Sequence, residues 1–310
     1  MKPENALSLP NLFIGGAPKC GTTSLTIYLR THPNVFVCEP KEPTYWATDM
    51  PGLRADLGFA TMERYASLFN SAQSSHRYLA DGSTMYLYSD NALKDIYARI
   101  PDAKFVFAIR NPVEVAHAYH MQMIFYEQDD QMDFEAAWRM QDARAAGELP
   151  VPKRCLSPKL LQYRYVAALG SQLEKLFLLI PKDRVHLVLM DDLKADAAKV
   201  YSEMLQFLEL PHDGRTEFGK ENAAMRTRSK VITRLMRTRL IRRVSWWGKQ
   251  NLSGWLHSCA KRMKNGITFE NAPRTPMSVQ FKRELTAFFA PEVESIEGVF
   301  GRDLSAWKSV

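Results

Sequence analysis

Hydrophobic residues gather in short runs, and a segment with helical spacing follows each run. Three runs are short enough to predict buried strands: 11–16 (NLFIGG), 104–109 (KFVFAI) and 185–190 (VHLVLM). The segments after them predict helices: 22–30, 112–126 (capped by Asn111) and 195–208 (ended by Pro211). Strands alternating with helices predict an α/β fold, with a mainly parallel central sheet flanked by helices on both faces.

The C-terminal residues predict further helices that pack on this core. Their apolar positions recur at helical spacing, interrupted at Pro291, and continue to the chain end: Leu285, Phe288, Phe289, Val293, Ile296, Leu304 and Trp307. The sequence has 310 residues and no internal repeat, which favours one elaborated domain over 1–310. In parallel sheets, ligands bind beyond the carboxyl ends of the strands, where the loops after Gly16 and Ile109 should converge.

Residues 16–23 (GAPKCGTT) have the spacing of a phosphate-binding loop between a strand and a helix. Backbone N–H groups from Gly21 to Ser24 can converge on an anion at the helix N-terminus. The loop is not a Walker A motif, because Thr22 follows Gly21 where that motif has Lys. The cation lies inside the loop, at Lys19. This position suits the bridging oxygen of a 5′-phosphosulfate, bound without metal, better than a Mg²⁺-bound β,γ-phosphate pair.

Four stretches resemble one enzyme family. The loop PKCGTTSL resembles the 5′-phosphosulfate-binding loop of the sulfotransferases that use 3′-phosphoadenosine-5′-phosphosulfate (PAPS), and FAIRNPVEVAHAY looks like their 3′-phosphate-binding strand and helix. KEPTYW is similar to the K-E-P-H-F-F stretch of bacterial and heparan-type carbohydrate sulfotransferases, and the segment from PRTPM to GRDLSAW resembles their C-terminal helices. The resemblance implies a P-loop-like fold and transfer of a sulfuryl group from PAPS to a hydroxyl or amine of a sugar, lipid or secondary metabolite.

The resemblance also implies the donor site. Arg110 is expected to hold the 3′-phosphate of PAPS, and Arg274 to close over it. Where the family usually has a Ser eight positions after this Arg, the chain has Ala118; neither neighbouring histidine, His117 or His120, is expected to replace it. The 5′ end of the donor is expected at the loop residues Lys19, Cys20, Gly21, Thr22, Thr23 and Ser24.

Two catalytic roles follow from the same resemblance. Lys19 is expected to stabilise the leaving phosphate, and Glu42 to be the general base, although Glu42 as a solvated partner of Lys41 is an open alternative. Thr44 stands where the family often has His, and Thr84 where it often has Pro. The acceptor side is predicted to include Lys41, Ser83 and Tyr86.

The net charge of +7 favours an anionic partner. Much of the excess lies at about 226–264, a basic segment without Asp or Glu, whose helical spacing predicts a basic amphipathic helix. That helix is compatible with an anionic membrane surface, an anionic polysaccharide or simple packing on the core. No nucleic-acid-binding motif is present, so a nucleic-acid partner is not expected.

The chain shows neither an export leader nor a membrane-length apolar run, and its four cysteines are widely spaced, so a cytoplasmic protein is expected. Two rival functions remain open. A P-loop nucleotide kinase or NTPase would need a Mg²⁺-holding carboxylate, for which Asp191 is the candidate. A non-enzymatic protein that binds anionic membranes would use 226–264 instead.

Overall fold

The computed structural model describes residues 8–219, 225–227, 269–271 and 276–309. The chain divides into two compact units, Met1–Lys220 together with Met277–Val310, and Glu221–Pro276. In the second unit, β6 (Met225–Thr227) pairs antiparallel with β7 (Phe269–Asn271). The single-domain expectation stays a prediction.

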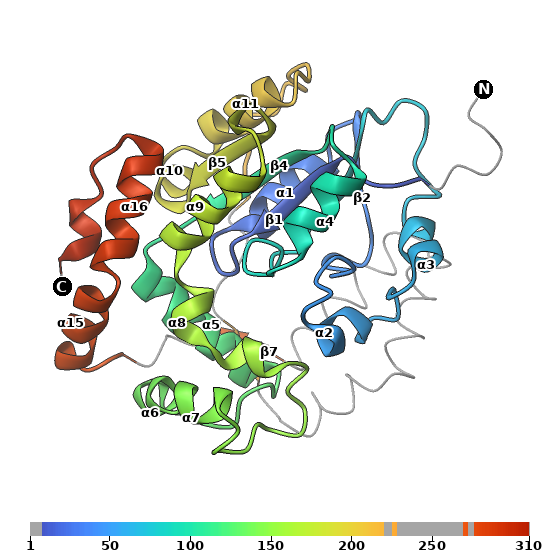
Figure 1. Ribbon diagram of the computed structural model, residues 1–310. Coiled ribbons are helices and arrows are strands. Elements are labelled where there is room, and N and C mark those ends of the chain that lie inside the picture. The colour runs from blue at the N-terminus through green and yellow to red at the C-terminus, as the bar shows by residue number, and fades with distance from the viewer. Residues whose placement is uncertain (1–7, 220–224, 228–268, 272–275, 310) are drawn as a thin grey trace. The chain divides into compact units, whose positions relative to one another are not determined.

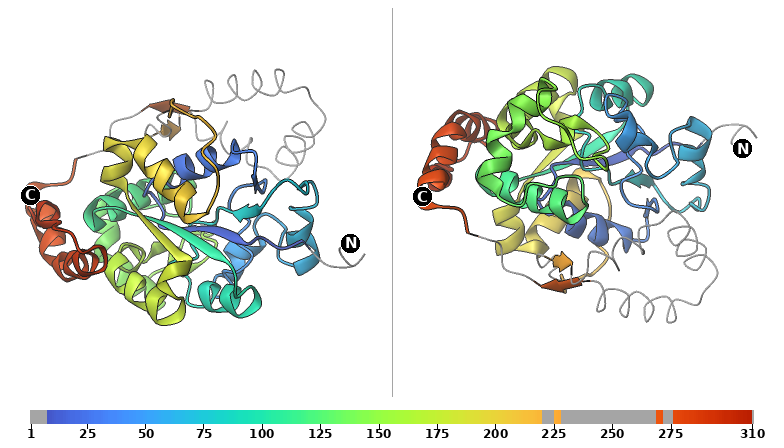
Figure 2. Two further views of the ribbon diagram at one scale, coloured as in Figure 1. Left: turned by 90° about the horizontal axis from the view of Figure 1, so that it is seen from above. Right: turned by 90° about the horizontal axis from the view of Figure 1, so that it is seen from below.

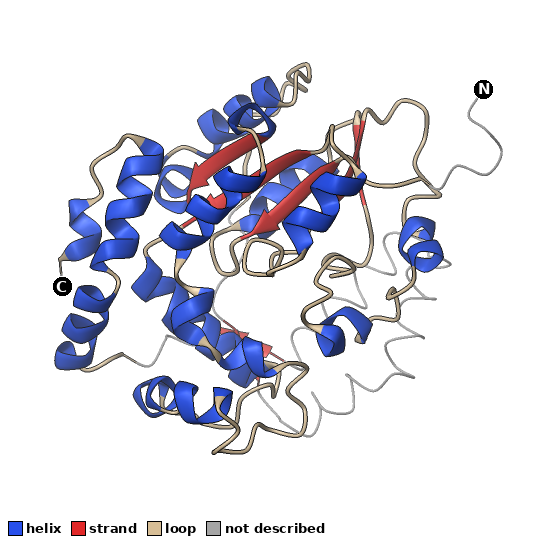
Figure 3. Ribbon diagram, in the orientation of Figure 1, coloured by secondary structure: helices blue, strands red, loops and turns tan. Residues whose placement is uncertain are grey.

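A five-stranded sheet forms the centre of the first unit (Figure 1), in the order β2-β3-β1-β4-β5. Its strands are β1 (Leu12–Gly16), β2 (Val35–Val37), β3 (Tyr78–Asp81), β4 (Lys104–Ile109) and β5 (Val185–Leu189). All neighbours pair in parallel, and the arrowheads in Figure 3 point the same way. The predicted fold class is confirmed, and β2 and β3 are strands that the apolar runs did not reveal.

Helices cover both faces of the sheet. In the left view of Figure 2, α1 (Thr22–Arg30) and α11 (Ala197–Phe207) lie on one side, and α4 (Ala92–Arg99) and α9 (Leu169–Leu179) on the other. The central strands β1 and β4 are buried on both faces, with one half-buried exception at Lys104. This explains their continuous apolar sequences, which are typical of strands in a covered parallel sheet.

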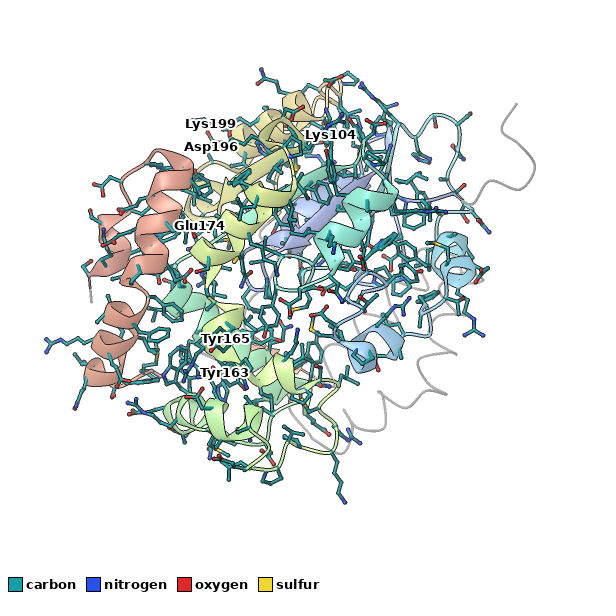
Figure 4. The ribbon with its side chains drawn as sticks, in the orientation of Figure 1. Lys104, Tyr163, Tyr165, Glu174, Asp196 and Lys199 are labelled. Atoms are coloured by element: carbon teal, nitrogen blue, oxygen red, sulfur yellow. The ribbon has the colours of Figure 1, made fainter. Side chains whose placement is uncertain are left out.

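Helix starts follow their capping residues. Asn111 accepts a hydrogen bond from Val113 N at 2.9 Å and begins α5 (Pro112–Phe125), as predicted. The segment after β5 differs from the prediction, because a short helix α10 (Met190–Ala195) precedes α11. Asp196 separates them and accepts from Lys199 N at 2.9 Å (Figure 4).

The remaining described elements extend the unit around α5 and α9. The C-terminal helices α15 (Val279–Phe288) and α16 (Ala290–Phe300) pack on α5 and α9, as predicted, although Phe288 is partly exposed. The shorter elements are α2 (Pro51–Ala55), α3 (Met62–Ser67), α6 (Phe134–Arg139), α7 (Gln141–Ala145), η1 (Pro158–Leu161), α8 (Tyr163–Val166), η2 (Lys182–Arg184) and η3 (Ser305–Lys308). No helix in the described part of the chain has the length and apolar character needed to cross a membrane.

Candidate active site

The loop between β1 and α1 has the backbone of an anion-binding turn. Gly21 is the N-cap residue of α1, with a left-handed φ of +92°, and it supplies no capping side chain. The N–H groups that open a helix carry the positive end of its dipole, but of those predicted to meet an anion Ser24 N already donates to Gly21 O at 3.0 Å. Lys19 also has a left-handed φ of +64°. The loop therefore presents a helix N-terminus and a lysine to the same carboxyl edge of the sheet.

Gly21 is required by packing as well as by its backbone angle. A Cβ atom there would lie 2.6 Å from Met190 Sδ and 3.0 Å from Leu193 Cδ2. Both neighbours belong to α10, which follows β5, two strands away from β1 in the sheet. Helix α10 therefore closes one side of the loop between β1 and α1.

The side chains of the loop point in different directions. Cys20 is fully buried; its N–H donates to Ala17 O at 3.3 Å and its thiol contacts Pro18 O at 3.4 Å. Burial raises the pKa of this thiol to about 12, so it is not a nucleophile at neutral pH. Thr22 and Ser24 are buried and Thr23 is half-buried. The predicted donor contacts of Cys20 are thus restricted by bonds that it makes within the loop.

Arg110 joins the two loops that were expected to converge. Its Nη1 donates to Lys19 O at 3.1 Å, and Ala17 N donates to Ala108 O at 2.9 Å. Arg110 is only 8% exposed, and its Nε donates to Glu114 Oε2 at 2.7 Å, with Nη2 on the same oxygen. The convergence predicted for the loops after Gly16 and Ile109 is therefore confirmed, and Glu114 is a partner that sequence reasoning missed.

No hydroxyl stands at position 118 on α5, where Ala118 is buried. Its histidine neighbours serve the core: His117 stacks on Phe134, and His120 packs on the same ring with its Nε2 2.8 Å from Gln131 O. Burial lowers the pKa of His120, which favours its neutral form. The histidines are packing residues, in line with the expectation that neither replaces the family's Ser.

Glu42 lies on the segment that follows β2, beside the loop between β1 and α1. Its Oε1 accepts from Lys41 Nζ at 3.0 Å, and its Oε2 accepts from Thr84 Oγ1 at 2.8 Å. Thr84 in turn neighbours the phosphate-binding loop, since a Cβ on Gly16 would lie 3.1 Å from Thr84 O. The Glu42 side chain is 38% exposed, which leaves it accessible to an acceptor. Glu42 therefore pairs with Lys41 and also borders the loop.

Ser83 and Tyr86 are fully buried around Asp81, at the end of β3. The Asp81 carboxylate accepts four hydrogen bonds: from Ser83 N and Oγ at 2.9 and 2.6 Å, and from the hydroxyls of Tyr65 and Tyr86 at 2.7 and 2.8 Å. Four donors suit an ionised carboxylate, although burial raises its pKa. Because Ser83 and Tyr86, two of the three predicted acceptor-side residues, are enclosed, they act by holding neighbouring backbone.

That backbone is the segment carrying Glu42. Thr44 N donates to Ser83 Oγ at 3.0 Å, and Trp46 N donates to the Tyr86 hydroxyl at 3.4 Å. Thr44 is buried and bonds Leu53 O through its hydroxyl at 3.1 Å, so it holds its own segment in place. Asp81 is a residue that sequence reasoning missed, because the four-residue strand that it ends was not revealed by the apolar runs.

Comparison with known proteins identifies the family of the chain. A family model described as the sulfotransferase domain matches residues 9–293. The chain belongs to the sulfotransferase family. Its predicted family membership is thereby confirmed.

Similarity to individual sulfotransferases is moderate in sequence. The chain is 26% identical over 208 residues to bifunctional heparan sulfate N-deacetylase/N-sulfotransferase 1 of Caenorhabditis elegans, covering 66% of this chain and 22% of that protein. It is 31% identical over 144 residues to carbohydrate sulfotransferase 15 of Mus musculus, covering 34% of this chain and 26% of that one. The matches thus span about a quarter of the length of these relatives.

A solved structure shares the fold over nearly its full length. The crystal structure of a sulfotransferase from Alicyclobacillus acidocaldarius matches with a TM-score of 0.70 and 22% identity, covering 97% of this chain and 99% of that one. The fold prediction is therefore confirmed a second time, independently of the motifs.

Two predicted features of the sulfotransferase lie outside the described residues. Arg274, expected over the donor, is one; the other is the basic segment 226–264, apart from Arg226 and Thr227 in β6. Asp191, the candidate Mg²⁺ ligand of the kinase alternative, accepts from Trp307 Nε1 at 2.9 Å and Lys194 Nζ at 3.0 Å. The match to the sulfotransferase family model argues against the kinase alternative.

Proposed function

We propose that this chain transfers the sulfuryl group of PAPS to a hydroxyl or amine of a carbohydrate acceptor. The observation that carries the proposal is the bond from Arg110 Nη1 to Lys19 O, which ties the Arg110 guanidinium to the backbone of the loop that precedes α1 and carries Lys19. A guanidinium fork suits a phosphate, and a helix N-terminus suits a second anionic group. The carbohydrate acceptor is suggested by the names of the relatives.

The proposed reaction breaks the bond between sulfur and the bridging oxygen of the 5′-phosphosulfate. The acceptor oxygen or nitrogen forms a new bond to sulfur, and the electron pair of the broken bond stays on the phosphate, giving adenosine 3′,5′-bisphosphate. Lys19 stabilises the negative charge that develops on this leaving oxygen. Glu42 takes the proton that the acceptor loses.

Glu42 has the features of a base at this position. It is partly exposed, it borders the phosphate-binding loop through Thr84, and its Oε1 accepts a hydrogen bond from Lys41 Nζ at 3.0 Å. Arg110 is proposed to hold the 3′-phosphate, at which point Glu114 must share or release the guanidinium. The proposed donor site thus uses charge supplied by β1, β4 and their following loops.

A radiolabel transfer assay tests this proposal. Wild-type protein is incubated with sulfur-labelled PAPS and separate acceptors: a heparan-type polysaccharide with free amines, a chondroitin-type polysaccharide, a hydroxylated lipid and a phenol. We expect label in a polysaccharide, and Glu42→Gln should slow transfer by about 10²- to 10⁴-fold while adenosine 3′,5′-bisphosphate still binds.

Glu39→Gln is the matched control, because Glu39 lies on the same segment and pairs with Arg30 at 2.6 Å. It should keep the wild-type rate. Full activity in Glu42→Gln would mean that another residue is the general base. Label in the phenol or the lipid alone would mean that the acceptor is not a carbohydrate. Absence of label in every acceptor would count against the transfer reaction.

A further inference from the structure

The Glu42 carboxylate is held by a hydroxyl from a distant part of the chain. Thr84 Oγ1 donates to Glu42 Oε2 at 2.8 Å, across 42 positions of sequence. Thr84 is buried, whereas Glu42 is partly exposed, so the donor is fixed inside the protein and the acceptor faces outward. This geometry is suited to orienting a carboxylate that must meet a substrate.

The turn that carries Thr84 is rigid. Asp81 accepts hydrogen bonds from both the N–H and the hydroxyl of Ser83, which fixes the turn immediately before Thr84. On the other side, Leu87 N donates to Gly15 O at 2.9 Å and ties the segment to β1. The Thr84 hydroxyl therefore has a defined place relative to the phosphate-binding loop.

The same turn also positions Lys41, the other partner of Glu42. A Cβ on Gly82 would lie 3.3 Å from both Cγ and Cε of Lys41, so the lysine stem runs along the glycine. Lys41 Nζ then reaches Glu42 Oε1 at 3.0 Å. Each carboxylate oxygen of Glu42 thus has one donor, and both donors depend on residues 82–84.

Glu42 needs these hydrogen bonds because its own backbone has an unfavourable conformation. Its φ is +64° and that of Thr44 is +54°, both in the left-handed region that non-glycine residues seldom adopt. Such angles persist only where the surroundings over-determine them. A glutamate also has three side-chain torsions, and hydrogen bonds to both oxygens restrict the rotation of the carboxylate.

We infer that Thr84 is a positioning residue for the general base, holding the Glu42 carboxylate toward the acceptor through its hydroxyl. The inference rests on the proposed role of Glu42. Thr84 acts through Glu42 and needs no contact with substrate, so its loss should lower kcat while leaving the acceptor KM and donor affinity close to wild type.

Three variants test the inference: Thr84→Val, which keeps the side-chain shape without the hydroxyl; Thr84→Ser, which keeps the hydroxyl; and Thr286→Val as the control. Thr286 is buried in α15, where its hydroxyl donates to Lys282 O at 2.8 Å. We expect Thr84→Val to lower kcat about 10-fold, Thr84→Ser to restore it to within about twofold, and Thr286→Val to leave it unchanged.

Thr84→Val is also combined with Glu42→Gln. If the hydroxyl acts through the carboxylate, the double variant should be no slower than Glu42→Gln alone, because residues acting as one unit are not additive. Calorimetry with adenosine 3′,5′-bisphosphate and thermal melting establish that each variant is folded.

The outcomes separate the two claims. A wild-type kcat in Thr84→Val, an equal loss in Thr84→Ser, or additive losses in the double variant would each overturn the role of Thr84 and leave Glu42 as the base. A wild-type rate in Glu42→Gln would instead overturn the proposed base, whatever Thr84→Val does.

Discussion

Replacing Arg110 by Lys should weaken the binding of the sulfuryl donor strongly, although the substitution keeps the positive charge. The guanidinium donates a hydrogen bond from Nη1 to Lys19 O. Its Nε and Nη2 both donate to one anionic group, which in this structure is the Glu114 carboxylate. A lysine ammonium is a single point of charge and cannot serve the loop carbonyl and a bidentate phosphate together.

The magnitude follows from the bonds that are lost. The bond to Lys19 O and a bond to phosphate both have the charged guanidinium as donor, and each contributes about 1.5–3 kcal/mol. Their sum, about 3–6 kcal/mol, corresponds to a loss of roughly 10²- to 10⁴-fold in affinity, at about 1.4 kcal/mol for each factor of ten. Arg110→Ala should lose more, because Glu114 then faces the 3′-phosphate without a cation between them.

The assay is calorimetric titration of each variant with adenosine 3′,5′-bisphosphate. Arg139→Lys is the matched control, since Arg139 also pairs with a glutamate four positions away, Glu135, at 3.3 Å on α6. Its affinity should equal wild type. If Arg110→Lys bound the nucleotide within about threefold of wild type, Arg110 would be only a tether for the loop, and the 3′-phosphate would have to be assigned to another cation.

Two predictions concern stability. Gly21→Ala should lower the free energy of unfolding by about 1–3 kcal/mol in denaturant titrations, because Gly21 has a left-handed backbone and Met190 lies close to its Cβ position. Gly214→Ala is the control: Gly214 also has a left-handed φ, of +77°, but no atom lies near its Cβ position, so only the backbone strain remains. Asp129 is bonded by Arg144, Tyr163 (Figure 4) and Gln131 N; burial opposes its ionisation, but these bonds prevail and its pKa is lowered. The stability that ionised Asp129 gives to the folded protein should therefore be complete above its unfolded-state pKa of about 3.9. It should disappear as the pH falls through its lower folded-state pKa. Asp129→Asn should cost about 3–5 kcal/mol at pH 7, a difference that narrows under acid; a constant difference down to pH 3 would contradict this sign.

The convergence of the loops after β1 and β4 was predictable because its signals are local. Arg110 stands directly after the apolar strand β4, Lys19 and Gly21 lie in the loop that follows the apolar strand β1, and parallel topology brings such positions to one edge. The parallel order itself needed only the alternation of strands and helices.

The acceptor side was not predictable in the same way. Strand β3 has only four residues, YLAD, and its last residue is the buried Asp81, which a pattern of apolar positions does not mark. The pairing of Glu42 with Thr84 depends on the order β2-β3-β1, which places the loops after β2 and β3 together. The resemblance assigned Ser83 and Tyr86 to the acceptor side, and that role stays a prediction; only the structure shows that both are enclosed around Asp81.

The most direct test of the central claim is titration of the wild-type protein and Lys19→Ala with adenosine 3′,5′-bisphosphate in the presence of a metal chelator. The account predicts tight metal-free binding by the wild type and clearly weaker binding by Lys19→Ala. If the wild type failed to bind without metal and instead bound ATP in the presence of Mg²⁺, the PAPS site in the loop would be contradicted. The loop would then be assigned to a nucleotide kinase or NTPase.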